Sequence, residues 1–192
     1  SFLFSFGFSC GGLLQPLYTQ NLKMDASSVG ILFFTSNLAS TITRLPAGIL
    51  ADRYSKRLSI SFASICFAAS SILFIFVTDF IQLLLPFALW GIGASFYFTA
   101  SNTLIADLTD TQNRVKTYAR IGMFGVLANI VSPLLTGYLA DNWSIPQTFS
   151  LSVISFTFLF AITIPLPKVK TEYNVSELDR RCKTLFSGAV KE

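Results

Sequence analysis

The sequence predicts an all-α polytopic membrane protein with six transmembrane helices. The first reason is composition, because 52% of the 192 residues are hydrophobic and only 12% are charged. Soluble domains carry about 25% charged residues. The second reason is that the charges cluster and leave long apolar tracts between them. A bilayer core of about 30 Å is crossed by about 20 mostly apolar residues in a helix, and several tracts reach that length. These observations disfavour a water-soluble helical bundle.

The apolar tracts define the expected spans and the connections between them. Gly7 and Gly11 in the first tract form a Gly-x-x-x-Gly pair, which is typical of close helix packing in lipid. A short loop is expected at 21–28, a minimal turn at 78–80 and a polar segment at 107–120. The expected spans cover residues 2–19, 29–51, 58–77, 81–106, 121–140 and 146–166.

The sequence divides into an apolar part, 1–167, and a charged and polar part, 168–192. The second part is expected to be a cytoplasmic linker or the start of a central loop. Apolar residues at helical spacing within it are compatible with a short amphipathic helix on the lipid headgroups. A solvated linker without a helix fits equally well. Ser1 already lies inside an apolar tract without a basic leader, so we expect a piece of a longer protein and no signal peptide.

Lysine and arginine are distributed unequally between the two expected membrane faces. Positive charge in short loops stays on the cytoplasmic side. One face receives Lys23 alone, so both ends of this chain are expected in the cytoplasm of a multi-pass cell-membrane protein. The other face receives Arg53, Lys56, Arg57, Arg114, Lys116, Arg120, Lys168, Lys170, Arg180, Arg181, Lys183 and Lys191.

The residue inventory argues against an enzyme. Histidine is absent, which excludes a histidine-based triad, metal site or proton relay. The three cysteines lack the paired spacing of a zinc site or a disulfide framework. No phosphate-binding loop and no deep pair of acids is visible. We therefore expect no enzymatic activity, no cofactor and no nucleic-acid partner.

The stretch 44–60, RLPAGILADRYSKRLSI, carries the most specific pattern. It joins two membrane-length apolar tracts through a charged hairpin. Gly48 is expected to let another helix approach closely. The stretch resembles the signature between the second and third spans of the major facilitator superfamily, with Ser55 where that family usually has glycine. The matching residues are Gly48, Leu50, Ala51, Asp52, Arg53, Lys56 and Arg57.

An internal sequence repeat supports the same resemblance. The segment Pro46–Asp52, which ends in Leu-Ala-Asp, has a counterpart in Pro133–Asp141, and the two copies end at opposite expected membrane faces. Two three-helix units of opposite orientation form the 3+3 inverted repeat that builds each half of such transporters. The resemblance therefore implies the N-terminal six-helix half, with a second six-helix half as its partner.

The resemblance also implies a cytoplasmic gate. Asp52 and Asp107, with Arg53 or Arg57, would form a charge network that keeps the inner side closed in the outward-open state, and Gly48 and Lys56 belong to the same motif. The alternative is that these charges only fix the topology of the spans.

Five polar residues within spans are candidates for the substrate pathway. Arg44 lies eight residues before Asp52, about 12 Å deeper along a helix. It either faces a pathway and contacts an anionic substrate, or extends toward the headgroups. The neutral candidates either line the cavity or bond across helices; they are Gln15, Asn37, Asn102 and Asn129.

We predict a secondary active transporter that moves a small solute across the bilayer by alternating access, in a rocker-switch motion. The phenylalanine-rich, charge-poor spans favour drug or metabolite efflux. Two alternatives remain: an importer of a small organic anion that uses Arg44, and a non-transporting six-span receptor or scaffold protein.

Overall fold

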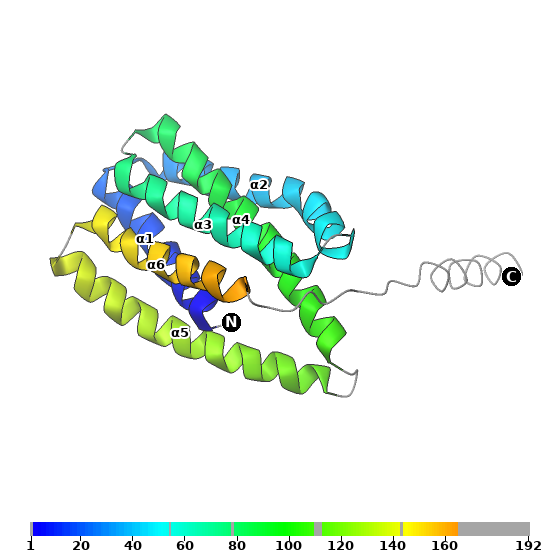
Figure 1. Cartoon of the computed structure of the whole chain (residues 1–192). Helices are drawn as coiled ribbons and strands as arrows, with labels where there is room; N and C mark the ends of the chain where they lie inside the picture. Colours follow the sequence, from blue (N-terminus) through cyan, green and yellow to red (C-terminus); the bar gives the residue numbers. More distant parts are fainter. Residues whose placement is uncertain (1, 54, 78, 110–112, 143, 165–192) are drawn as a thin grey trace, which may run out of the picture.

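The computed structural model describes residues 2–53, 55–77, 79–109, 113–142 and 144–164, without the side chains of Asp52 and Arg53. The segment 168–192 and its predicted amphipathic helix lie outside the described residues. Within the described residues, six helices follow one another in the expected order (Figure 1). They are α1 (Phe2–Asn21), α2 (Ala26–Arg53), α3 (Lys56–Phe76), α4 (Phe80–Leu108), α5 (Arg114–Asn142) and α6 (Ile145–Thr163).

Four of the described helices, α3 to α6, are long and apolar enough to cross a membrane by length and composition alone. The helices α1 and α2 are also long, with 20 and 28 residues. They do not meet the same criterion of length and composition, and they carry polar side chains such as Gln15, Asn37 and Arg44. The polar residues expected to serve a pathway therefore reduce the hydropathy of these two helices.

The helices α4 and α5 are longer than the predicted spans. Each has 29 residues and is about 43 Å long. The expected polar connection at 107–120 is wrong in extent, because α4 continues to Leu108 and α5 already begins at Arg114. Lysine and arginine are good helix formers, so a helix does not have to end where its apolar tract ends.

The contacts between helices repeat in a regular way. The helix α2 packs on α4 as α5 packs on α1, and α3 packs on α4 as α6 packs on α1. The helices α3 and α6 pack against each other. Exchanging the first three helices with the last three therefore leaves this pattern of contacts unchanged. Both α2 and α5 also contain an internal proline, Pro46 and Pro133. The predicted 3+3 repeat is confirmed.

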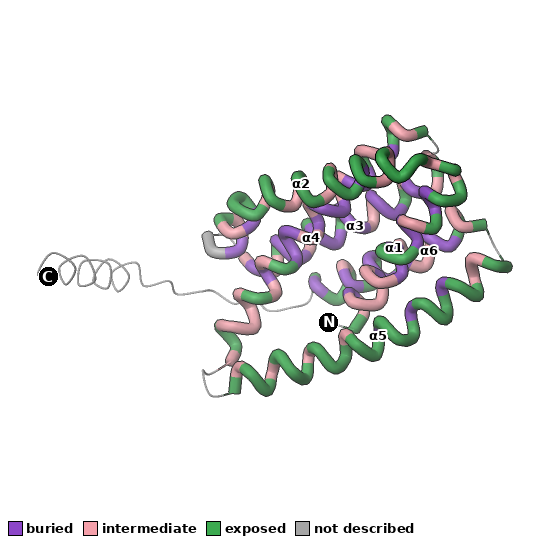
Figure 2. Tube along the Cα trace, turned by 180° about the vertical axis from the view of Figure 1, so that it is seen from behind, coloured by how far each residue is buried: buried purple, intermediate pink, exposed green. Residues whose placement is uncertain are grey.

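The side chains form two apolar clusters along the bundle. One includes Ala51, Ile60 and Ala100, near the junction of α2 and α3. The other includes Tyr18 and Phe149, near the junctions of α1 with α2 and of α5 with α6. The two equivalent helices α2 and α5 are the most exposed (Figure 2). The buried residues of α5 are a single stripe at every fourth position, namely Ala128, Ser132 and Thr136.

The helices α2 and α4 approach each other closely at Gly91. A Cβ atom at this position would overlap the backbone carbonyl oxygen of Ser36 and would lie 2.8 Å from its carbonyl carbon. Because no side chain separates the two backbones here, only glycine fits. This contact fixes the position of α2, which carries Asn37 and Arg44.

Candidate functional site

Lys56 and Asp107 form an ion pair between the first residue of α3 and the last turn of α4. Lys56 is 3% exposed, and the side chain of Asp107 is 33% exposed. A lysine at a helix N-terminus and an aspartate at a helix C-terminus each oppose the helix dipole. Their pairing compensates both unfavourable placements and joins the two helix ends. Both residues are in the set predicted for the gate, but the basic partner of Asp107 is Lys56, whereas the sequence pattern had indicated Arg53 or Arg57.

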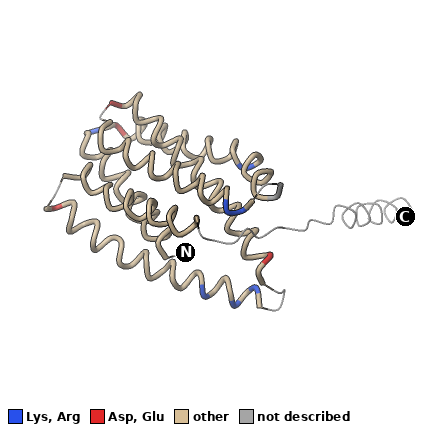
Figure 3. Tube along the Cα trace, viewed as in Figure 1, with Lys and Arg blue, Asp and Glu red and all other residues tan. Residues whose placement is uncertain are grey.

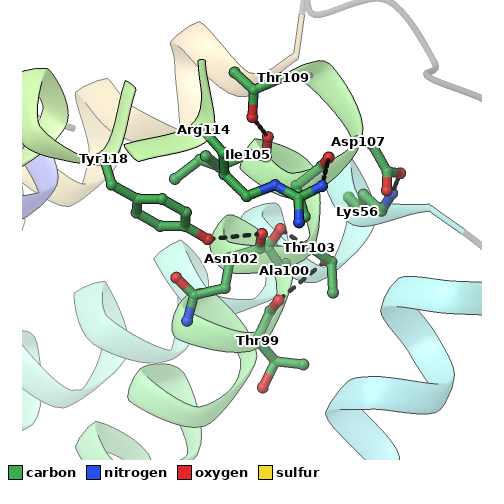
Figure 4. A network of polar contacts seen from close by, with 11 residues as sticks. Lys56, Thr99, Ala100, Asn102, Thr103, Ile105, Asp107, Thr109, Arg114 and Tyr118 are labelled. Carbon is green, nitrogen blue, oxygen red and sulfur yellow. Dashed lines mark hydrogen bonds and ion pairs between the residues drawn. The ribbon is translucent and has the colours of Figure 1, made fainter. Parts of the chain in front are cut away.

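Two residues at the start of α5 bind backbone carbonyls at the end of α4 (Figure 4). Arg114 Nη2 donates a hydrogen bond to the carbonyl of Ala106 at 2.9 Å. The Tyr118 hydroxyl donates to the carbonyl of Asn102 at 3.3 Å. The Ala106 carbonyl lies in the last turn of α4, where carbonyls lack a partner within the helix. These bonds couple α4 to α5 beside the Lys56–Asp107 pair.

Sequence reasoning did not single out Arg114 and Tyr118 as residues that bind the end of α4. Their spacing of four places them on one face of a helix. That signal was lost because residues 107–120 were expected to be one polar connection.

The remaining residues of the gate motif do not take part in the described Lys56–Asp107 ion pair. Arg57 donates a hydrogen bond to the carbonyl of Ile164, at the end of α6. Gly48 is half-buried, and no described atom lies within 4 Å of a Cβ placed there. The close helix approach expected at Gly48 is therefore not found among the described residues, and it occurs at Gly91 instead. The side chains of Asp52 and Arg53 lie outside the described residues.

Four of the five pathway candidates are exposed and one is buried. Arg44 and Asn37 are exposed on α2, Asn102 on α4 and Asn129 on α5. Asn37 donates to the carbonyl of Phe33 at 2.9 Å, within its own helix. Gln15 is only 3% exposed, and its Nε2 has no hydrogen-bond partner among the described residues. Gln15 therefore differs from the other four candidates, because its side chain lies inside the bundle.

Aromatic side chains connect α1 and α4. Phe8 stacks on Trp90 with ring centroids 5.4 Å apart. It meets Phe98 edge to face at 5.9 Å. Phe98 is 48% exposed, although large aromatic residues usually bury most of their area. The Phe8–Phe98 pair therefore offers an apolar, aromatic surface on α1 and α4, the equivalent first helices of the two repeats.

Charged residues gather at the two ends of the helices (Figure 3). Long apolar helices with charges at their ends, an inverted repeat and polar side chains within the spans together define one half of a membrane-transporter fold. The family model of the major facilitator superfamily matches residues 1–186. The chain belongs to the major facilitator superfamily, a family of membrane transporters and not of enzymes.

Individual relatives agree with this assignment. An uncharacterized MFS-type transporter of Methanocaldococcus jannaschii is 25% identical over 181 residues, which cover 91% of this chain and 46% of that protein. The quinolone resistance protein NorA of Staphylococcus aureus is 25% identical over 177 residues, with the same coverages of 91% and 46%. The chain thus spans about half the length of these curated relatives.

A solved structure shows the same fold. The crystal structure of a peptide transporter POT in complex with sulfate superposes with a TM-score of 0.64 at 15% sequence identity. The superposition covers 98% of this chain and 44% of that one. The six helices of this chain therefore have the arrangement of helices found in part of a solved transporter.

Proposed function

We propose that this chain is the N-terminal six-helix half of a secondary active transporter that exports small, largely apolar solutes by alternating access. Membership of the major facilitator superfamily supports transport. The exposed faces of α2 and α5 are suited to pack on a second six-helix half, because they already present much of their length outside this bundle (Figure 2). The pathway would lie between the two halves.

The observation that carries the efflux proposal is the Phe8–Phe98 pair, in which Phe98 is 48% exposed and Phe8 is half-buried. A surface of aromatic rings with few charges suits apolar or cationic aromatic solutes, because rings bind both by apolar contact and through their electron-rich faces. A relative is named a quinolone resistance protein, which supports the same solute class. Asn102, on the same helix as Phe98, would supply a neutral hydrogen-bonding group.

The Lys56–Asp107 pair is proposed as the inner gate. It joins the ends of α3 and α4, and the Arg114 and Tyr118 bonds extend the contact to α5. An ion pair of which one partner is buried and the other partly hydrated can open when water reaches it. The gate would therefore favour the outward-open state while the pair is formed.

The proposed sidedness follows from the same residues. The gate end carries the basic hairpin, so it would face the cytoplasm by the positive-inside rule. Residues 1–167 would form the membrane domain, and 168–192 would form the cytoplasmic linker to the second half.

The efflux proposal is tested by replacing Phe98 with alanine in the complete protein. The host would be bacterial cells that lack their own drug exporters, and the assay would measure retained ethidium. Phe98→Ala is expected to raise ethidium retention. Phe158→Ala is the matched control, because Phe158 is 57% exposed on α6 and lies outside the Phe8–Phe98 pair. Equal retention in the two variants, or no export by the unchanged protein, would contradict the proposal.

A second candidate function is import of a small organic anion. The supporting observation is that Arg44 is exposed on α2, deep within the helix. Charged side chains within membrane-spanning helices usually lie on a substrate or ion pathway. Arg44→Gln is then expected to raise the half-saturation constant for anions and leave neutral solutes unchanged. Arg120→Gln, at the start of α5, is the charge-matched control.

A further inference from the structure

A furrow runs between α3 and α6 on the outer surface of the bundle. It consists of two adjacent hollows with volumes of about 520 Å³ and about 290 Å³. Ile65 and Phe160 line both hollows, so the two meet at these side chains. The larger hollow begins at Ser55 and Arg57, and the smaller one reaches Ile72.

The sequence of α3 explains why the furrow exists. Small side chains stand on the lining face of this helix where larger ones would fill the space, namely Ser61, Ser64, Ala68 and Ala69. The distance along the helix from Arg57 to Ile72 is about 22 Å at 1.5 Å per residue. Half of the bilayer core is about 15 Å thick. The furrow is therefore long enough to hold an extended acyl chain of one leaflet.

Among the described residues that line it, the furrow has a charged side chain at one end only. Arg57 lines the larger hollow together with the hydroxyl-bearing residues Ser55 and Ser61. No acidic side chain lines either hollow among the described residues. The bond from Arg57 to the Ile164 carbonyl holds its guanidinium between α3 and α6. A guanidinium carries five N–H donors, and its planar fork matches a phosphate group.

We propose that this furrow binds one anionic phospholipid, with its phosphate on Arg57 and one acyl chain between α3 and α6. Both helices are long and apolar enough to cross a membrane, so their exposed outer faces meet lipid. The apolar lining accepts the acyl chain, and the single positive end selects the headgroup. The basic end is the proposed cytoplasmic side, and the cytoplasmic leaflet is the one that carries anionic lipids.

The first experiment measures lipid retention by native mass spectrometry of the complete protein in neutral detergent. Phosphatidylglycerol and phosphatidylcholine with identical acyl chains are added separately. The unchanged protein is expected to retain phosphatidylglycerol more strongly. Arg57→Gln is expected to reduce that preference about fivefold, the effect of one basic side chain at an anionic headgroup. Arg120→Gln removes the same charge from α5 and is expected to change nothing.

A second variant tests the acyl-chain part of the site without altering charge. Ala69 is half-buried and lines the smaller hollow, so Ala69→Phe fills part of the furrow. It is expected to weaken retention of long-chain phosphatidylglycerol and to leave short-chain phosphatidylglycerol unaffected. Three outcomes would overturn the proposal: equal retention of both lipids, equal losses in the two arginine variants, or no effect of Ala69→Phe on long-chain lipid.

Discussion

The close contact between α2 and α4 leads to a graded prediction for three glycines. Gly91→Ala places a methyl group against the backbone of Ser36. Backbone cannot rotate away as a side chain can, so the two helices must separate. Gly11→Ala meets the ring of Trp90 instead, a buried side chain that has some freedom to turn. Gly122→Ala meets nothing within 4 Å among the described residues.

The magnitudes follow from these surroundings. Overpacking a tight contact costs about 1–3 kcal/mol, so we expect Gly91→Ala to lower the free energy of unfolding by about 2 kcal/mol. A loss of this size is expected to lower the Tm. Gly122→Ala is expected to be neutral or stabilising by up to about 1 kcal/mol, because alanine is the better helix former. Gly11→Ala should lie between them.

The assay is thermal denaturation of the three variants in one detergent, monitored by size-exclusion chromatography of the heated protein. Solute transport by Gly91→Ala is measured in parallel, because a shift of α2 displaces Asn37 and Arg44 together. A melting temperature of Gly91→Ala equal to that of Gly122→Ala would refute the argument that backbone contact at Ser36 fixes α2.

Three further predictions concern single contacts. Asp107→Lys is expected to open the inner side and to increase labelling of a cysteine engineered there. The exchanged pair, Lys56→Asp with Asp107→Lys, should restore the original labelling. Equal labelling of the single and double variants would contradict the gate. Tyr118→Phe removes one hydrogen bond to α4 and should cost about 0.6 kcal/mol in unfolding experiments, with Tyr138→Phe as a control because Tyr138 is 69% exposed on the same helix. Tyr18→Phe removes the 2.5 Å hydrogen bond from the hydroxyl to the Val77 carbonyl. It should lower the free energy of unfolding by about 0.5–1.5 kcal/mol. An unchanged Tm would show that this bond does not join α1 to the end of α3.

The sequence was sufficient to predict the order and approximate bounds of the six helices that the structure describes. Long apolar tracts and punctuating charges carry that information, as in the turn at 78–80 between α3 and α4. The error at 107–120 came from equating a polar segment with a loop. Polar residues show where a helix leaves the apolar layer of the membrane. Where the helix itself ends depends on the groups that bind its last carbonyls, as Arg114 binds the carbonyl of Ala106.

The candidate site was harder to predict than the fold. The resemblance indicated Arg53 or Arg57 as the partner of Asp107, but the structure pairs Asp107 with Lys56, because pairing between helices depends on how each helix is rotated. The position of Gly91 against Ser36 depends on the same rotation, and no local pattern distinguishes Gly91 from Gly48. The Phe8–Phe98 contact was also hidden, because both residues lie in tracts rich in phenylalanine.

The inverted repeat places equivalent helix ends at opposite faces, and the two faces use different chemistry. At the gate end, the start of α3 meets the end of α4 through the Lys56–Asp107 ion pair. The equivalent contact at the other end is the start of α6 with the end of α1. There Ile145, Leu22 and Tyr18 belong to one apolar cluster. Water can separate an ion pair by hydrating both charges, whereas apolar surfaces remain associated in water. One backbone arrangement used twice thus gives a polar contact at one face and an apolar contact at the other. The polar contact is the one that added salt would weaken first.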